Sequence, residues 1–176
     1  MDLNGKFVSQ LTTETGLGPT GGGYWSPDGK EIVYNRNEQG KFREVVRTLG
    51  EISPKGVVDN ADLSFWSPDG KKLVFVRFNP ARTKQDVWTH VLETGEEKQL
   101  TSLEWNAAFP SWSTDGNWIA FNVDKKNTRE VWVISSSGET PRLVLTGESE
   151  YSHPQDRKST RLNSSHIQKS RMPSSA

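Results

Sequence analysis

The chain has 176 residues, about the length of one domain, and a formal net charge of zero. No stretch approaches the roughly 18 apolar residues of a membrane-spanning helix, and the absence of cysteine excludes disulfides and thiolate metal sites. Seven tryptophans, 15 glycines and 9 prolines favour aromatic-rich strands joined by many turns. This composition argues against a helical bundle, a coiled coil or a disordered chain.

Three segments of the chain align with one another. They read YWSPDGKEIVY, FWSPDGKKLVF and SWSTDGNWIAF, and they cover residues 24–34, 65–75 and 111–121. Their tryptophans follow one another at spacings of 41 and 46 residues. Repeats of about 40 to 50 residues with strand signals indicate the blades of a β-propeller.

Each segment begins with a strand and then a tight turn, in which glycine supplies a positive φ and aspartate bonds to the turn backbone. The turn residues are Asp28 and Gly29, Asp69 and Gly70, and Asp115 and Gly116. Because equivalent positions on separate blades lie far apart, the three aspartates are not expected to form one metal or substrate site. We interpret them as structural turn residues.

A second strand follows each turn and is apolar on both faces, which indicates burial between two neighbouring sheets. A third strand, a glycine turn and a short fourth strand complete each repeat, and four antiparallel strands are the unit of a propeller blade. Five tryptophans recur in the first and third strands: Trp25, Trp66, Trp112, Trp88 and Trp132. We expect them in the core between blades rather than on a platform that stacks sugars or bases.

The predicted fold class is therefore all-β, a fragment of a β-propeller with about three four-stranded antiparallel blades. The predicted blades are residues 13–58, 59–102 and 103–147. Residues 1–12 are read as the end of a preceding blade, and residues 148–155 as the start of the next one.

The Trp-Ser-Pro-Asp-Gly turn, followed by lysine and alternating apolar residues, resembles the TolB-like (WD40-like) propeller repeat. The resemblance covers residues 1–155, and the third copy departs from it at Thr114 and Asn117. It implies that the chain is part of a closed propeller, truncated at both ends, in a periplasmic or cell-envelope setting.

Residues 156–176 differ in composition from the rest of the chain. They carry five basic residues against Asp156 alone, a net charge of +4, so the remaining 155 residues carry −4. The segment resembles the translation of a sequencing-library adapter. We therefore predict a non-native, disordered tail, and do not read it as an arm that binds nucleic acid or membrane.

Four polar residues are candidates for facing a ligand at the mouth of the propeller channel. Asn60, Asp62 and Asn106 are expected in the loops that enter first strands, and His153 precedes the next expected first strand. No metal site is predicted, because His90 and His153 are the only histidines outside the tail. No cofactor or catalytic residue is predicted either, since the chain has no Gly-x-Ser-x-Gly motif.

The leading functional hypothesis is a non-catalytic propeller scaffold that binds a protein or peptide partner. No nucleic-acid partner and no membrane insertion are expected, and the open fragment is expected to self-associate through its apolar end faces. The alternative is the gating propeller of a prolyl-oligopeptidase-type serine peptidase whose catalytic domain lies elsewhere. A fragment of a propeller polysaccharide lyase is a weaker alternative.

Overall fold

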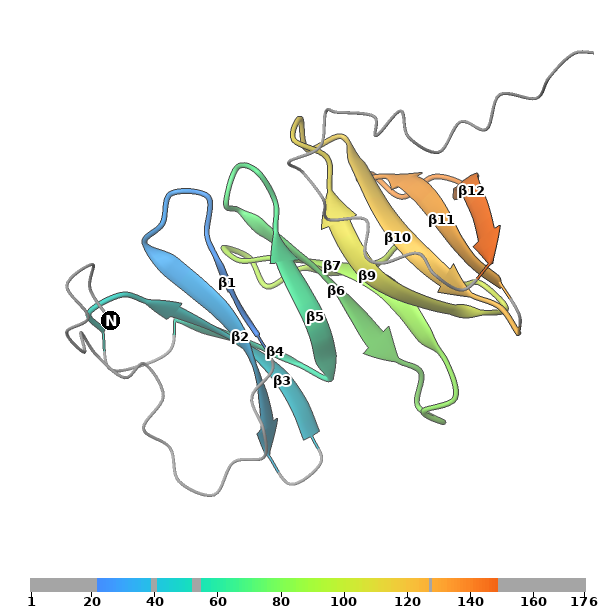
Figure 1. Ribbon diagram of the computed structural model, residues 1–176. Coiled ribbons are helices and arrows are strands. Elements are labelled where there is room, and N and C mark those ends of the chain that lie inside the picture. Colours follow the sequence, from blue (N-terminus) through green and yellow to red (C-terminus); the bar gives the residue numbers. More distant parts are fainter. Residues whose placement is uncertain (1–21, 39–40, 52–54, 127, 149–176) are drawn as a thin grey trace, which may run out of the picture.

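The computed structural model describes residues 22–38, 41–51, 55–126 and 128–148 (Figure 1). These residues form three four-stranded antiparallel sheets, and no helix occurs among them. Sheet 1 contains β1 (Gly23–Trp25), β2 (Glu31–Glu38), β3 (Lys41–Thr48) and β4 (Gly56–Asp59). Sheet 2 contains β5 (Ala61–Trp66), β6 (Lys72–Phe78), β7 (Gln85–Val91) and β8 (Glu97–Gln99). Sheet 3 contains β9 (Asn106–Trp112), β10 (Trp118–Asp124), β11 (Thr128–Ser135) and β12 (Arg142–Glu148).

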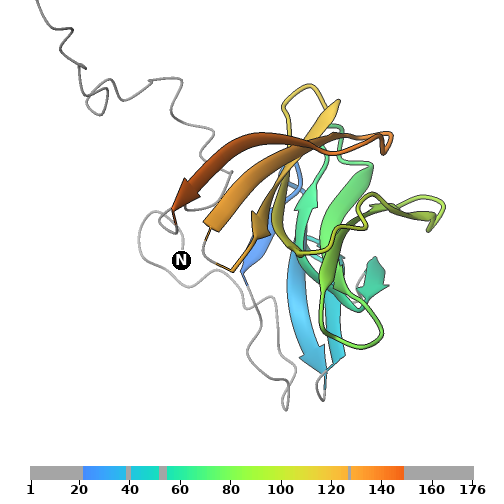
Figure 2. The ribbon, with the colours of Figure 1, turned by 90° about the vertical axis from the view of Figure 1, so that its right-hand side faces the viewer.

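The strands of each sheet pair in chain order, so the all-β prediction of four-stranded antiparallel repeats is confirmed. Figure 1 shows the three sheets standing side by side in the order of the chain, and Figure 2 shows the stack from the side of sheet 3. The predicted segments 1–12 and 156–176 lie outside the described residues, as does the predicted segment 148–155 except Glu148, which ends β12.

The turn between the first two strands has the same bonding in every sheet. In sheet 2 the Ser67 hydroxyl donates to Asp69 Oδ1 over 2.6 Å, the Lys71 amide donates to the same oxygen over 3.0 Å, and Gly70 has φ 70°. The equivalent bonds form around Asp28 and Asp115. Each aspartate is thus bonded within its own turn, in a different sheet.

Apolar side chains fill the space between neighbouring sheets. One cluster joins sheets 1 and 2 and contains Val33, Val46, Val58, Leu73 and Phe75, among others. A larger cluster joins sheets 2 and 3 through one face of each second strand, with Val74 and Val76 from β6 and Phe121 from β10. Because alternate residues of β6 enter different clusters, sheet 2 is covered on both faces.

The tryptophans of the first strands differ in burial. Trp66 and Trp112 are 6% and 5% exposed, and Trp66 Nε1 donates to the Tyr24 carbonyl of sheet 1 over 3.0 Å. Trp25 is 55% exposed, so the prediction of a core position is wrong for this residue. Trp66 and Trp112 each pack on a preceding sheet, whereas no described sheet precedes Trp25 in the stack.

The third-strand tryptophans, Trp88 and Trp132, are partly buried. Trp88 packs against the cluster between sheets 1 and 2, and Trp132 against the cluster between sheets 2 and 3. In the register Trp88 pairs with Phe75 and Trp132 with Phe121. Each indole therefore extends the apolar face of the second strand toward the outer part of its sheet.

The difference in burial between Trp66 and Trp25 predicts that the same substitution has unequal effects at these two equivalent positions. Trp66→Phe removes the bond to the Tyr24 carbonyl and leaves a small cavity, so it should lower the free energy of unfolding by about 1–2 kcal/mol. Trp25→Phe should change it by less than about 0.5 kcal/mol. Urea unfolding of the two variants measures both values, and equal losses would contradict the packing described above.

Candidate functional site

A cavity of about 590 Å³ opens between sheets 1 and 2. It lies at the loop end of the stack, where β6 ends, β7 begins and the chain passes from β4 to β5. Its lining residues are Phe42, Asn60, Asp62, Arg77, Phe78, Asn79, Pro80, Arg82, Asp86, Trp88 and Gln99. We call this space the inter-sheet cavity.

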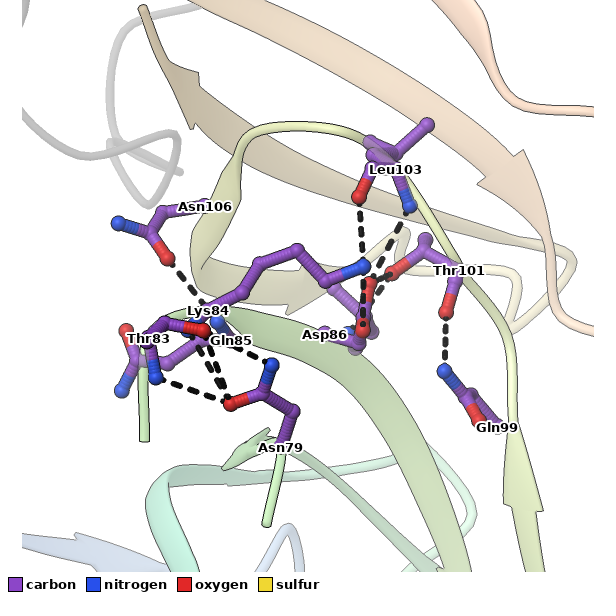
Figure 3. A network of polar contacts seen from close by, with 10 residues as sticks. Asn79, Thr83, Lys84, Gln85, Asp86, Gln99, Thr101, Leu103 and Asn106 are labelled. Carbon is purple, nitrogen blue, oxygen red and sulfur yellow. Dashed lines mark hydrogen bonds and ion pairs between the residues drawn. The ribbon is translucent and has the colours of Figure 1, made fainter. Parts of the chain in front are cut away.

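The structure brings together only two of the four predicted ligand-facing residues. Asn60 and Asp62 line the inter-sheet cavity. Asn106 does not line it, and its side-chain oxygen accepts a hydrogen bond from the Gln85 amide over 2.9 Å (Figure 3). His153 lies outside the described residues.

The predicted entry loops are also shorter than expected. Asp62 lies within β5 and Asn106 begins β9, while Asn60 alone links β4 to β5, with φ 53°. The first strands extend toward the loop end beyond their apolar Trp-containing part, which is why the sequence pattern assigned these polar residues to loops.

Arg77 forms part of the cavity wall and is held by several groups. Its guanidinium lies over the rings of Phe75 and Trp88, at 5.0 and 4.8 Å from the centroids. It also donates to both carboxylate oxygens of Glu97, over 2.6 and 3.0 Å, and to the Asp59 carbonyl of sheet 1 over 2.9 Å. The Arg77 hydrogen bond is the main cause that lowers the pKa of Glu97, so this ion pair leaves Arg77 neutralised.

A second polar network surrounds Asp86, which lines the cavity (Figure 3). Lys84 Nζ lies 3.2 Å from Asp86 Oδ2 and donates to the Leu103 carbonyl over 2.6 Å. Asp86 Oδ1 accepts from the Thr101 hydroxyl over 3.2 Å and from the Leu103 amide over 3.3 Å. The network therefore ties β7 to the segment that leads into sheet 3 and neutralises Asp86.

Two carboxyl groups meet at the boundary between sheets 1 and 2. Asn35 Nδ2 lies 3.3 Å from Glu44 Oε1, 3.4 Å from Asp62 Oδ1 and 3.5 Å from the Ala61 carbonyl. An amide nitrogen carries two hydrogens, so the three oxygens share two donors. Glu44 is 2% exposed, and no ion pair of either carboxylate occurs in the described part of the chain.

This burial changes the acidity of the groups. Burial raises the pKa of Glu44 from 4.5 to about 8, and the nearby Asp62 charge contributes in the same direction. Burial also raises the pKa of Asp62. Burial is likewise the main cause that raises the pKa of the Tyr24 hydroxyl, and the charges of Glu44 and Asp62 add to it. Glu44 and Asp62 therefore lie together with no neutralising charge from the described residues.

The described residues contain no group of three or more histidine, cysteine, aspartate or glutamate side chains arranged to hold a metal ion. They also contain no helix long and apolar enough to cross a membrane. His90 lies outside the cavity lining, with Nδ1 3.4 Å from Glu97 Oε1.

The stacked four-stranded sheets are blades of a β-propeller, and solved structures share this arrangement. A TolB from Agrobacterium tumefaciens has a TM-score of 0.61 at 25% identity, covering 72% of this chain and 46% of its own. TolB from Acinetobacter baumannii has a TM-score of 0.60 at 23% identity, covering 82% of this chain and 35% of its own.

Peptidase propellers are similar as well. The β-propeller domain of the Trilobed protease from Pyrococcus furiosus has a TM-score of 0.56 at 22% identity, covering 69% of this chain and 40% of its own. The chain thus spans less than half the length of each of these three structures. No family model and no curated protein matches the sequence.

The buried acid predicts a pH-dependent stability. The pKa of Glu44 is raised on folding, so its contribution is fully present below the unfolded pKa and is lost as pH rises to about 8. Glu44→Gln should remove this loss and make the protein more stable than the wild type at pH 8, by on the order of 2 kcal/mol.

Urea unfolding between pH 5 and about 8.5 tests this expectation. The exposed Glu139→Gln serves as the control and should follow the wild-type profile. Parallel profiles for the wild type and Glu44→Gln would show that Glu44 is not protonated in the folded state.

Proposed function

We propose that the chain is part of a non-catalytic propeller scaffold that binds a protein or peptide partner in the inter-sheet cavity. The observation that carries this proposal is the cavity itself, since about 590 Å³ lies within the range of roughly 300–1,000 Å³ typical of ligand sites. A space of this size accommodates one or two side chains of a bound peptide.

The lining supports a peptide rather than a purely apolar ligand. Phe42, Phe78 and Trp88 supply aromatic surface, and Asn60 and Gln99 supply amide groups that pair with a peptide backbone. A few polar groups set among aromatic walls are typical of selective binding sites.

The similarity to TolB structures supports a scaffold in the cell envelope. We also propose that the fragment self-associates, because Leu143, Val144 and Leu145 of β12 are 44% or more exposed, as is Trp25 of sheet 1. The alternative function, the gating propeller of a serine peptidase, is favoured by the similarity to the Trilobed protease propeller.

The gene sequence beyond codon 155 separates the two functions. A frame that continues into a Gly-x-Ser-x-Gly nucleophile motif supports the peptidase, and a frame that ends after further propeller blades supports the scaffold. The same sequence tests whether residues 156–176 derive from a library adapter, since an adapter-free read that still encodes them would overturn that proposal.

Binding is tested by selecting displayed peptides on the wild-type chain and measuring their affinity for two variants. Phe42→Ala removes one wall of the inter-sheet cavity and should weaken the selected peptides by tenfold or more, about 1.4 kcal/mol. Trp25→Ala removes an exposed aromatic side chain outside that cavity and should leave the affinity unchanged. Peptides that bind Phe42→Ala as tightly as the wild type would show that they bind outside the inter-sheet cavity.

A further inference from the structure

The charged residues of the inter-sheet cavity are unequally neutralised. Arg77 is paired with Glu97, and Asp86 with Lys84. Asp62 forms no ion pair with the described residues, and it accepts hydrogen bonds only from Asn35 and from the amide of Leu63. Asp62 is therefore the cavity carboxylate that lacks a countercharge.

The other groups at this sheet boundary supply no countercharge to Asp62. Glu44 lies behind it on β3, and both carboxyl groups contact the Asn35 amide from β2. Burial raises the pKa of the Tyr24 hydroxyl on β1, and the charges of Glu44 and Asp62 raise it further. Glu44 and Tyr24 supply no positive charge, and the cavity cation Arg77, whose strand pairs with that of Asp62, is paired with Glu97, so a positive charge placed at Asp62 is favoured.

The other cationic residue in the cavity lining is Arg82. It is exposed, and its guanidinium lies 5.5 Å from the centroid of the Phe78 ring and 5.8 Å from that of Phe42. Solvent and salt screen an exposed charge strongly, so Arg82 opposes an entering cation weakly.

We propose that Asp62 determines the specificity of the inter-sheet cavity by binding the cationic side chain of an arginine or lysine in the peptide partner. This inference rests on the proposed function and names the chemistry that the same cavity selects. Phe42, Phe78 and Trp88 hold the apolar stem of such a side chain, and its charged end supplies the countercharge that Asp62 lacks.

Binding of a cation at Asp62 is linked to the protonation of its carboxyl group. Burial raises the pKa of Asp62 in the free protein, and a bound cation favours the ionised form and lowers that pKa again. Binding of a cationic ligand therefore releases protons and becomes tighter as the pH rises through the raised pKa. A neutral ligand of the same shape shows no such dependence through Asp62.

Two blocked dipeptides test the inference by isothermal titration calorimetry. N-acetyl-Phe-Arg-amide carries a guanidinium, and N-acetyl-Phe-citrulline-amide is its neutral isostere. The wild type should bind the arginine probe at least tenfold more tightly, and Asp62→Asn should reduce this ratio to about one, because asparagine keeps the bond to the Leu63 amide but loses the charge.

A matched control is Asp59→Asn, which removes the neighbouring carboxylate that pairs with Arg43 and should keep the wild-type ratio. Equal affinity of the wild type for both probes would overturn the role of Asp62 while leaving the cavity as a peptide site. Failure of the wild type to bind either probe would overturn the proposed function as well. A ratio that survives Asp62→Asn would assign the selectivity to another residue.

Discussion

The packing of apolar strand faces between neighbouring sheets is the constraint on which the rest of this structure depends. A second strand such as β6 is apolar on both faces, so it is stable only when a sheet covers each side. The first-strand tryptophans reinforce this packing, since the Trp66 indole reaches across to the backbone of sheet 1. The stacking of three sheets is thus a direct result of burying these residues.

The same packing creates the inter-sheet cavity and its unusual electrostatics. Toward the loop end, the apolar contacts between sheets 1 and 2 give way to polar side chains, which the neighbouring sheet still shields from water. Glu44 and Asp62 lie in this region because β3 and β5 continue beyond the apolar core. Burial there raises the pKa of both carboxyl groups, and Asp62 remains the cavity carboxylate without a countercharge.

The two aspartates that line the inter-sheet cavity differ in the partners that neighbouring residues provide. Asp86 and Asp62 are both strand residues near the loop end of sheet 2, but Lys84 and two further donors satisfy Asp86 (Figure 3). Asp62 instead faces Asn35 and Glu44 of the preceding sheet. The first aspartate consequently stabilises a connection between sheets, while the second is the one we propose for recognising a cation.

The sequence alone determined the all-β fold, the three repeats and the order of strands, because turn residues and apolar alternation act over a few positions along the chain. It also predicted Asn60 and Asp62 as ligand-facing residues, and both line the inter-sheet cavity. Only the tertiary structure separated them from Asn106, showed Trp25 exposed where Trp66 is buried, and revealed Phe42, Arg77 and Glu44 at the site. These properties depend on which residues of a neighbouring sheet cover each side chain, and the local sequence pattern carries no information about that.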